Sequence, residues 1–106
     1  MKEVTVQELK EKREANEEFF LLDVREDVEY LVSNLDGEHI PLGQLQNRMK
    51  ELEEKKNEEV IVMCRSGNRS SRAVSYLESQ GFENASNLKG GMKAWASEID
   101  PSVPVA

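Results

Sequence analysis

Two short runs of apolar residues, each followed at once by polar residues, dominate the hydrophobic pattern of the chain. The first run lies in residues 19–24 and the second is residues 60–63. Continuous apolar runs of this length are typical of strands that are buried on both faces of a parallel sheet. A weaker strand is predicted over residues 84–88, and residues 39–42 predict a brief extended stretch that Pro41 ends. The pattern therefore predicts two central strands and two lesser ones.

Apolar residues at helical spacing lie before, between and after these strands. Thr5-Val6-Gln7-Glu8 has the spacing of a capping box and predicts a helix to about Glu14, with Val6 and Leu9 facing the core. Apolar residues three and four positions apart predict an amphipathic helix over residues 43–54. The other predicted helices span residues 26–31, residues 70–79, capped by Ser70 or Ser71, and residues 90–96, with Trp95 in the core.

Strands that alternate with helices predict an α/β fold with a small, mostly parallel sheet and helices on both faces. The length of 106 residues allows one domain, residues 1–106. We expect its core over about residues 4–97 and an extended tail over residues 98–106, where two prolines exclude regular structure. In parallel sheets, ligands bind beyond the carboxyl ends of the strands, which is where Asp23 and Cys64 are expected.

Charge is unevenly distributed in this acidic chain, which carries a net charge of −7. Residues 1–63 hold 9 Lys and Arg against 17 Asp and Glu, whereas residues 64–95 hold 5 against 2. The overall acidity argues against binding along a nucleic-acid backbone. The cationic segment would instead concentrate small anions beside Cys64, although a row of solvated helix faces explains the same charges.

Other features of the sequence restrict where the protein works. No apolar run is long enough to cross a membrane, and residues 1–5 lack the apolar core of a signal peptide. The single cysteine excludes an internal disulfide and a cysteine-rich metal site, and it is consistent with a reducing compartment. We therefore expect a cytoplasmic protein that contains no metal and does not bind membranes.

Candidate chemistry is concentrated in the loop that follows residues 60–63. Cys64 opens this polar loop, and helix-compatible residues come next. Backbone N–H groups, a helix N-terminus and guanidinium charge can all stabilise a thiolate, which is the nucleophilic form of cysteine. The residues expected to form this loop and bind substrate are Arg65, Ser66, Gly67, Asn68, Arg69 and Ser70.

Ionisation of Cys64 needs more than one of these contributions. A free thiol has a pKa near 8.5. Lowering that pKa by about two pH units requires about 2.7 kcal/mol of extra stabilisation of the thiolate. A helix N-terminus supplies at most about 2 kcal/mol. We expect the remainder to come from N–H groups, which Gly67 allows to point inward, and from Arg65 or Arg69. The alternatives are a buried structural cysteine and a solvated Arg65.

Three motifs resemble those of the rhodanese family. Rhodaneses carry Cys-x-x-Gly-x-Arg, which Cys64, Gly67 and Arg69 fill, and the Asp23-Val24-Arg25 and Gly90-Gly91 segments are also similar to theirs. The resemblance implies a rhodanese-like fold in which Cys64 takes sulfane sulfur from thiosulfate or a related small anionic donor. The resulting persulfide would pass its sulfur to a thiophilic acceptor. Asp23 and Arg25 would have supporting roles, with a surface salt bridge as the alternative, and no cofactor is implied.

Two further segments resemble one particular subgroup of rhodanese domains. Residues 34–45 and the tail over residues 99–105 are similar to the rhodanese domains fused to enzymes that adenylate sulfur-carrier proteins. The resemblance therefore implies a sulfur-carrier protein or another thiol as the acceptor. His39, the only histidine, is interpreted as a partly exposed loop residue rather than a general base, because an ionised thiol needs none.

Two other functions stay open on the same scaffold. A non-catalytic or regulatory rhodanese module would dock a partner protein. A rhodanese-related phosphatase or arsenate reductase would use Cys-x5-Arg, but the sixth residue after Cys64 is Ser70. Because a loop that is one residue shorter suits a single sulfur better than a tetrahedral phosphate, sulfur transfer is the expected activity.

Overall fold

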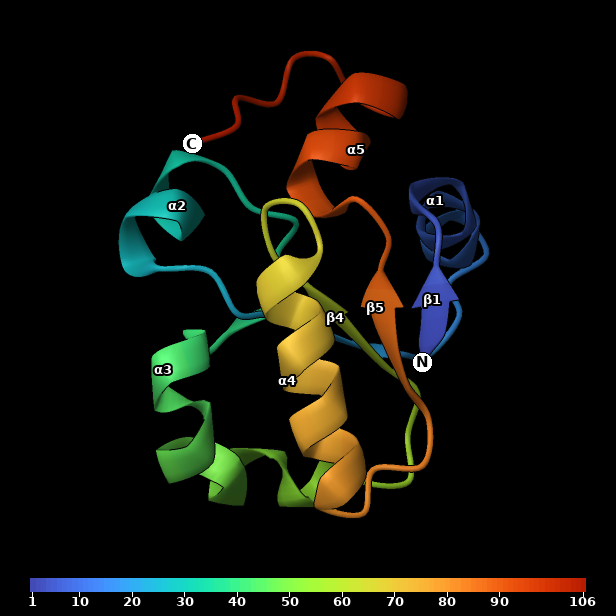
Figure 1. The fold of residues 1–106 in the computed structure, drawn as a ribbon. Coiled ribbons are helices and arrows are strands. Elements are labelled where there is room, and N and C mark those ends of the chain that lie inside the picture. Colours follow the sequence, from blue (N-terminus) through green and yellow to red (C-terminus); the bar gives the residue numbers. More distant parts are fainter.

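A five-stranded sheet crosses the centre of the protein in a computed structural model that describes residues 1–106 (Figure 1). All neighbouring strands are parallel, and their order is β1-β5-β4-β2-β3. The strands are β1 (Lys2–Val4), β2 (Phe20–Asp23), β3 (Glu38–His39), β4 (Val60–Met63) and β5 (Ala85–Leu88). The predicted α/β fold with a parallel sheet is confirmed.

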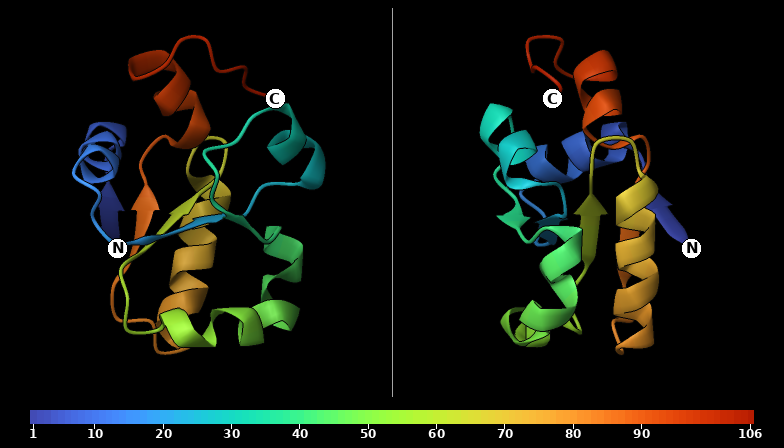
Figure 2. Two further views of the ribbon diagram at one scale, coloured as in Figure 1. Left: turned by 180° about the vertical axis from the view of Figure 1, so that it is seen from behind. Right: turned by 60° about the vertical axis from the view of Figure 1, so that its left-hand side comes forward.

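Helices cover both faces of this sheet, as predicted (Figure 2). They are α1 (Val6–Glu14), α2 (Asp27–Val32), α3 (Leu42–Leu45), the 3₁₀-helix η1 (Gln46–Lys55), α4 (Asn68–Ser79) and α5 (Gly91–Glu98). One buried apolar cluster joins α3, η1 and α4 to the sheet, and a second joins α1 and α5 to the opposite face. Val60 and Val62 of β4 belong to the first cluster, whereas Ile61 and Met63 belong to the second. Both faces of this central strand are buried, which explains its uniformly apolar sequence.

The two central strands end side by side. β2 and β4 pair in parallel with Asp23 opposite Met63, so the residues that follow the two strands meet at one edge of the sheet. Figure 1 shows that the loop after β4, the helix α2 and the start of α5 gather at this edge. The predicted meeting of Asp23 and Cys64 at the carboxyl edge is therefore confirmed.

Some details of the predicted elements differ from the structure. The apolar pattern misses β1, because Val4 is its only buried residue and pairing with β5 defines the strand. The single helix predicted over residues 43–54 is wrong, because α3 ends at Leu45 and η1 continues with a kink at Arg48. Apolar spacings of three and four residues fit a 3₁₀-helix as well as an α-helix over so short a segment. The stretch predicted over residues 39–42 is β3, which is shorter and begins one residue earlier.

The tail that follows α5 runs back over the protein towards α2 (Figure 1). Val103 and Val105 pack against the second apolar cluster, and the Ser33 hydroxyl donates to the carbonyl oxygen of Pro104. These contacts hold the tail close to the polar edge of the sheet. Among the helices, none has the length and apolar character needed to cross a membrane.

Candidate active site

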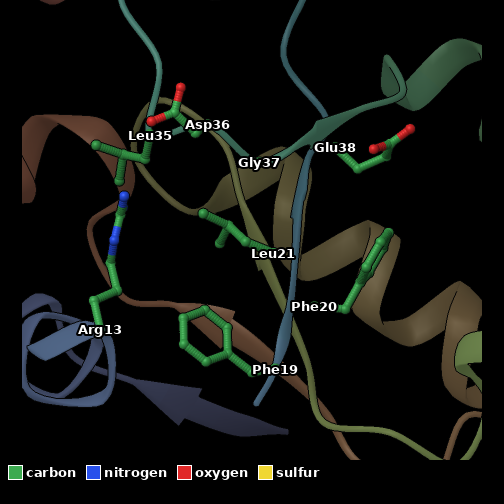
Figure 3. Close-up of a pocket in the computed structure, with 8 residues that line it drawn as sticks. All are labelled: Arg13, Phe19, Phe20, Leu21, Leu35, Asp36, Gly37 and Glu38. Atoms are coloured by element: carbon green, nitrogen blue, oxygen red, sulfur yellow. The ribbon is translucent and has the colours of Figure 1, made fainter. Parts of the chain in front are cut away.

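The largest cavity of the protein does not contain the cysteine. It has a volume of about 350 Å³ and lies beside the beginning of β2, between Arg13, Phe19 and Leu35 (Figure 3). Cys64 lines none of the four cavities in the structure. Any chemistry at the cysteine therefore depends on the groups that touch the sulfur and not on a roomy pocket.

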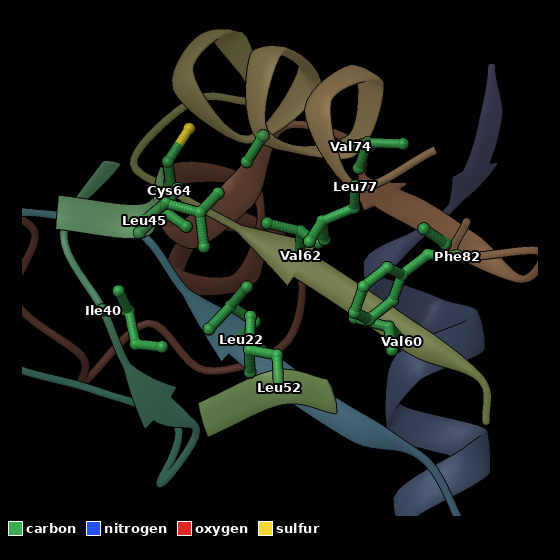
Figure 4. Close-up of a cluster of buried hydrophobic side chains, with 13 residues drawn as sticks. Leu22, Ile40, Leu45, Leu52, Val60, Val62, Cys64, Val74, Leu77 and Phe82 are labelled. Atoms are coloured by element: carbon green, nitrogen blue, oxygen red, sulfur yellow. The ribbon is translucent and has the colours of Figure 1, made fainter. Parts of the chain in front are cut away.

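Cys64 lies directly after β4, at the polar edge of the sheet. Only 1% of its surface is exposed, and its side chain lies at the margin of the apolar cluster beneath α4 (Figure 4). The residue is a free thiol. Because burial in apolar surroundings makes a thiol inert, the polar groups around the sulfur decide whether it can react.

Hydrogen-bond donors from the following loop converge on the Cys64 sulfur. The Gly67 N–H donates to it over 3.1 Å and the Ser70 N–H over 3.4 Å, and the Ser70 hydroxyl lies 3.3 Å away. Sulfur is a weak acceptor as a neutral thiol, and hydrogen bonds to a charged acceptor are stronger. This arrangement of donors therefore favours the thiolate.

The start of α4 corrects the sequence-based expectation. The helix begins at Asn68 rather than after a capping Ser70 or Ser71, and its N-cap is Gly67, whose φ of 102° lies in the left-handed region. No side chain caps the helix. The Cys64 sulfur accepts an N–H group that a capping side chain would otherwise take. Ser70 consequently lies in the first turn, where both its N–H and its hydroxyl reach the sulfur.

The pKa of the Cys64 thiol lies below its usual value. Burial raises this pKa and is the largest single influence, but hydrogen bonds from the hydroxyl and N–H of Ser70 and from the backbone of Gly67 and Ser66 together outweigh it. The expected contribution of loop N–H groups is therefore present, whereas the charge of Arg65 or Arg69, expected beside it, is not among the main lowering contributions. The positions of the two arginines explain why.

Arg69 forms a two-pronged ion pair with Glu29 of α2, with N–O distances of 2.6 and 2.8 Å. Donation from the guanidinium lowers the pKa of Glu29 to about 2. The carboxylate in turn offsets the positive charge that Arg69 would exert on the sulfur. The pKa of Arg69 is raised first by Glu29 and, to a smaller extent, by the charge on Cys64, so part of the guanidinium charge still acts on the sulfur.

The other predicted loop residues do not contact the sulfur through their side chains. The Nε–H of Arg65 donates over 2.7 Å to the carbonyl oxygen of Ala106. Ser66 and Asn68 are exposed, and the Asn68 carbonyl accepts a hydrogen bond from the Ser71 hydroxyl. Of the predicted residues, Gly67 and Ser70 donate to the sulfur at the distances given above, and the backbone of Ser66 makes a smaller contribution.

Asp23 and Arg25 form a buried ion pair and not a surface salt bridge. Each is at most 1% exposed, and Nε and Nη2 of Arg25 donate to the Asp23 carboxylate over 2.8 to 3.1 Å. The same guanidinium donates to the carbonyl oxygens of Glu29 and Ser33. Because α2 buries none of its residues, these bonds are a main attachment of the helix. The pair therefore helps to place Glu29, the partner of Arg69.

The start of α5 packs against the backbone of the cysteine loop. A Cβ at Gly91 would lie 2.4 Å from the carbonyl oxygen of Cys64, and the φ of Gly91 is +55°. Only glycine permits this approach without strain. The N–H groups of Met92 and Lys93 then donate, over 3.0 and 2.9 Å, to the carbonyls of the first two loop residues. This contact orients the peptide that carries the cysteine.

Asn87 of β5 also reaches the loop, although the sequence patterns do not single it out. Its side chain is buried, Nδ2 donates over 3.1 Å to the Gly67 carbonyl, and Oδ1 accepts from the Ser70 hydroxyl. The one available signal is the polar pair Ser86-Asn87 near the carboxyl end of a predicted strand. Glu29 is likewise missed as a site residue, because its partner lies 40 positions away in the chain.

His39 and Trp95 contribute to the packing around this edge of the sheet. The His39 ring stacks on Tyr30 with centroids 4.5 Å apart, and its Nε2 lies 2.7 Å from the Arg25 carbonyl oxygen. Trp95 is buried in the second apolar cluster, with the guanidinium of Arg13 over its ring. Trp95 is therefore a core residue, as predicted.

Similarity to known proteins agrees with the loop and the fold. Residues 5–98 match the family described as Rhodanese-like domain. The chain belongs to the rhodanese family. A Bacillus subtilis (strain 168) protein named "Putative sulfurtransferase YtwF" is 42% identical over 102 residues, which are 95% of this rhodanese and 96% of that protein.

Two further similarities extend the comparison. "Adenylyltransferase and sulfurtransferase MOCS3" of Arabidopsis thaliana is 37% identical over 116 residues, which cover 95% of this chain but 25% of that protein. A crystal structure from Staphylococcus saprophyticus subsp. saprophyticus has a TM-score of 0.83 and 35% identity, and the match covers 93% of this chain and 97% of that one. Family and relatives together support sulfurtransferase activity for this rhodanese, and the resemblance stated from its motifs is confirmed.

Proposed function

We propose that this rhodanese takes sulfane sulfur from thiosulfate or a related anionic donor as a persulfide on Cys64, and then passes the sulfur to a thiophilic acceptor. The observation that carries this proposal is the group of three donors around the Cys64 sulfur. They stabilise the thiolate that attacks the donor, and they stabilise it again when it is released in the second step.

The bond changes of the proposed reaction balance without a cofactor. The Cys64 thiolate attacks the outer sulfur of thiosulfate, the sulfur–sulfur bond of the donor breaks, and its electron pair leaves with sulfite. An acceptor thiolate then attacks the outer sulfur of the persulfide, and the electron pair of that bond returns to Cys64. Each step exchanges one sulfur–sulfur bond for another, so neither step needs an external oxidant or reductant.

The confined surroundings of the sulfur support sulfur transfer over phosphoryl transfer. With 1% of Cys64 exposed, the loop admits a donor that presents one sulfur atom more readily than a tetrahedral group. Nη1 and Nη2 of Arg69 bind Glu29, whereas its Nε–H takes no part in that pair. We assign this N–H the role of binding the anionic end of the donor, in agreement with the preference of guanidinium groups for oxyanions.

We propose a protein or small-molecule thiol as the acceptor, with a sulfur-carrier protein as the leading candidate. Support comes from the similarity to MOCS3, which carries both adenylyltransferase and sulfurtransferase in its name. Because the reaction requires Cys64 as a free thiol, the proposal places the protein in a reducing compartment such as the cytoplasm.

Mass spectrometry after incubation with thiosulfate tests the proposal. We expect one added sulfur atom, which cyanide or a reductant removes and which is absent from the Cys64→Ala variant. Hydrolysis of an aryl phosphate without sulfur uptake would instead indicate a phosphatase. A protein that shows neither activity but retains a stable partner in a pull-down would be a docking module.

A further inference from the structure

The Ser70 hydroxyl lies between two acceptors that it cannot serve at once. One is the Cys64 sulfur at 3.3 Å, and the other is Oδ1 of Asn87. A hydroxyl has a single proton, so it donates to one acceptor at a time. The carboxamide oxygen is the stronger acceptor while the sulfur is a neutral thiol, and the sulfur becomes the stronger one when it is charged. The direction of the hydroxyl therefore depends on the charge of Cys64.

The orientation of the Asn87 carboxamide follows from its second contact. Nδ2 lies 3.1 Å from the carbonyl oxygen of Gly67, which can only accept a hydrogen bond, so the carboxamide oxygen must face Ser70. The Gly67 carbonyl also accepts the Ser71 N–H over 3.1 Å, which anchors the start of α4 independently of Asn87. Asn87 is 5% exposed, so water does not readily replace either contact.

We propose that Asn87 is a positioning residue that acts on Cys64 through Ser70. It holds the hydroxyl proton while the sulfur is neutral and yields it when the sulfur is charged. This inference rests on the proposed function, in which Cys64 is a thiolate before it attacks the donor and again after the acceptor has taken the sulfur. As the electron pair returns to Cys64, the hydroxyl turns from Asn87 to the new thiolate.

Competition for the hydroxyl gives Asn87 a definite effect on the thiol. Ionisation of Cys64 breaks the bond between Ser70 and Asn87, so the carboxamide opposes ionisation while the hydroxyl favours it. This balance keeps the thiolate from being stabilised so far that it becomes a poor nucleophile. Of the charged groups around the loop, Arg69 acts on the sulfur through its charge but is paired with Glu29, Asp23 is paired with Arg25, and Arg65 donates to the Ala106 carbonyl.

The pH dependence of Cys64 alkylation by iodoacetamide tests this inference. We expect Asn87→Ala to lower the pKa of the thiol by about 0.5, because ionisation no longer breaks a hydrogen bond. Ser70→Ala should raise that pKa, because the thiolate loses a donor. The variant with both substitutions should have the same pKa as Ser70→Ala, since Asn87 acts only through Ser70.

Ser86→Ala is the matched control, because Ser86 is a buried polar residue next to Asn87 on the same strand and on the opposite face of the sheet. In Ser86→Ala, the pKa of the Cys64 thiol should be the same as in the unmodified protein. If Asn87→Ala does not fold, Asn87→Val supplies a side chain that suits a strand and lacks both polar atoms.

Two results would overturn the inference. A higher thiol pKa in Asn87→Ala, or effects of the two substitutions that simply add, would mean that Asn87 only braces the loop. Alkylation measures the thiol without any sulfur donor. Its outcome is therefore distinguishable from a failure of Cys64 to accept sulfur from thiosulfate.

Discussion

The ends of the two central strands lie side by side and use their polar groups in opposite ways. After β2, the guanidinium of Arg25 donates to oxygen atoms of Asp23, Glu29 and Ser33. After β4, donors from Gly67 and Ser70 converge on the Cys64 sulfur. Oxygen is a strong acceptor in every state of the protein, whereas sulfur is a strong one only when it is ionised.

The difference shows how one edge of a sheet can hold both a structural and a reactive network. A fully satisfied buried network gains nothing from a change of charge and therefore stabilises one conformation. Donors that face a thiol gain most when it becomes a thiolate, so they favour chemistry. Substitutions in the Asp23–Arg25 network should therefore lower the stability of the protein, and substitutions around Cys64 should alter the reaction.

The largest expected effect follows from Asp23→Ala. This change leaves the Arg25 guanidinium buried without its counter-charge, which costs about 3–5 kcal/mol in the free energy of unfolding. Urea denaturation followed by circular dichroism measures the loss. Asp27→Ala on α2 is the control, since that side chain is 80% exposed and its removal should change stability by about 0.5 kcal/mol or less. Equal losses in the two variants would contradict the structural role of the Asp23–Arg25 pair.

Gly91→Ala should have the next largest effect, because it disturbs the contact between α5 and the cysteine loop. Strain at a positive φ and a clash with the Cys64 carbonyl together cost about 3 kcal/mol in the free energy of unfolding. Gly43→Ala in α3 meets no atom within 4 Å and should leave stability unchanged or slightly higher. Thermal unfolding of both variants measures the contrast, which would disappear if the loop readily moved away from α5.

Arg69→Ala tests the reactive network. We expect kcat/KM for thiosulfate to fall about tenfold or more, because a hydrogen bond from a charged donor contributes about 1.5–3 kcal/mol. The fold should remain intact, as judged by circular dichroism. Arg72→Ala removes an exposed arginine from the same helix and should retain most activity. Unchanged sulfur transfer in Arg69→Ala would remove this arginine from the proposed mechanism.

The smallest effect is expected from Glu29→Gln. Glu29 links the two networks, because its carbonyl accepts from Arg25 and its carboxylate pairs with Arg69. Glutamine keeps an oxygen for the Glu26 N–H but loses the charge that pairs with Arg69. The folded pKa of Glu29, about 2, lies below its ordinary value of 4.5, so the ion pair stabilises the protein above pH 4.5 and this contribution disappears as the pH falls towards 2.

We expect wild type to exceed Glu29→Gln by about 1 kcal/mol at neutral pH, since Arg69 is 30% exposed and water screens the pair. Urea denaturation at a series of pH values measures the difference. A gap that persists unchanged at pH 2 would show that the carboxylate charge is not its source.

Local patterns predicted those parts of the site that depend on residues close together in the chain. The apolar residues of β4 and the polar residues after them placed Cys64 at the carboxyl edge, and the glycine after Ser66 indicated a tight loop. The patterns placed the start of α4 too late. They did not reveal that the Cys64 sulfur, and not a serine hydroxyl, would accept the N–H group that a capping side chain usually takes. They also gave the charge of the arginines a main part in ionising the thiol, because they did not reveal that Glu29 pairs with Arg69 and offsets its charge.

By itself, the sequence determined the order of the four strands after β1 and the alternation of strands with helices, the cysteine proposed as the nucleophile, and the motifs that place the chain among the rhodaneses. Only the tertiary structure decided which groups reach the loop from elsewhere: Asn87 from β5, Glu29 from α2 and the Gly91 backbone from α5. The physical reason is that helix and strand periodicity arise from neighbouring residues. Hydrogen bonds between distant segments depend instead on strand order and register, which form only when the whole sheet packs.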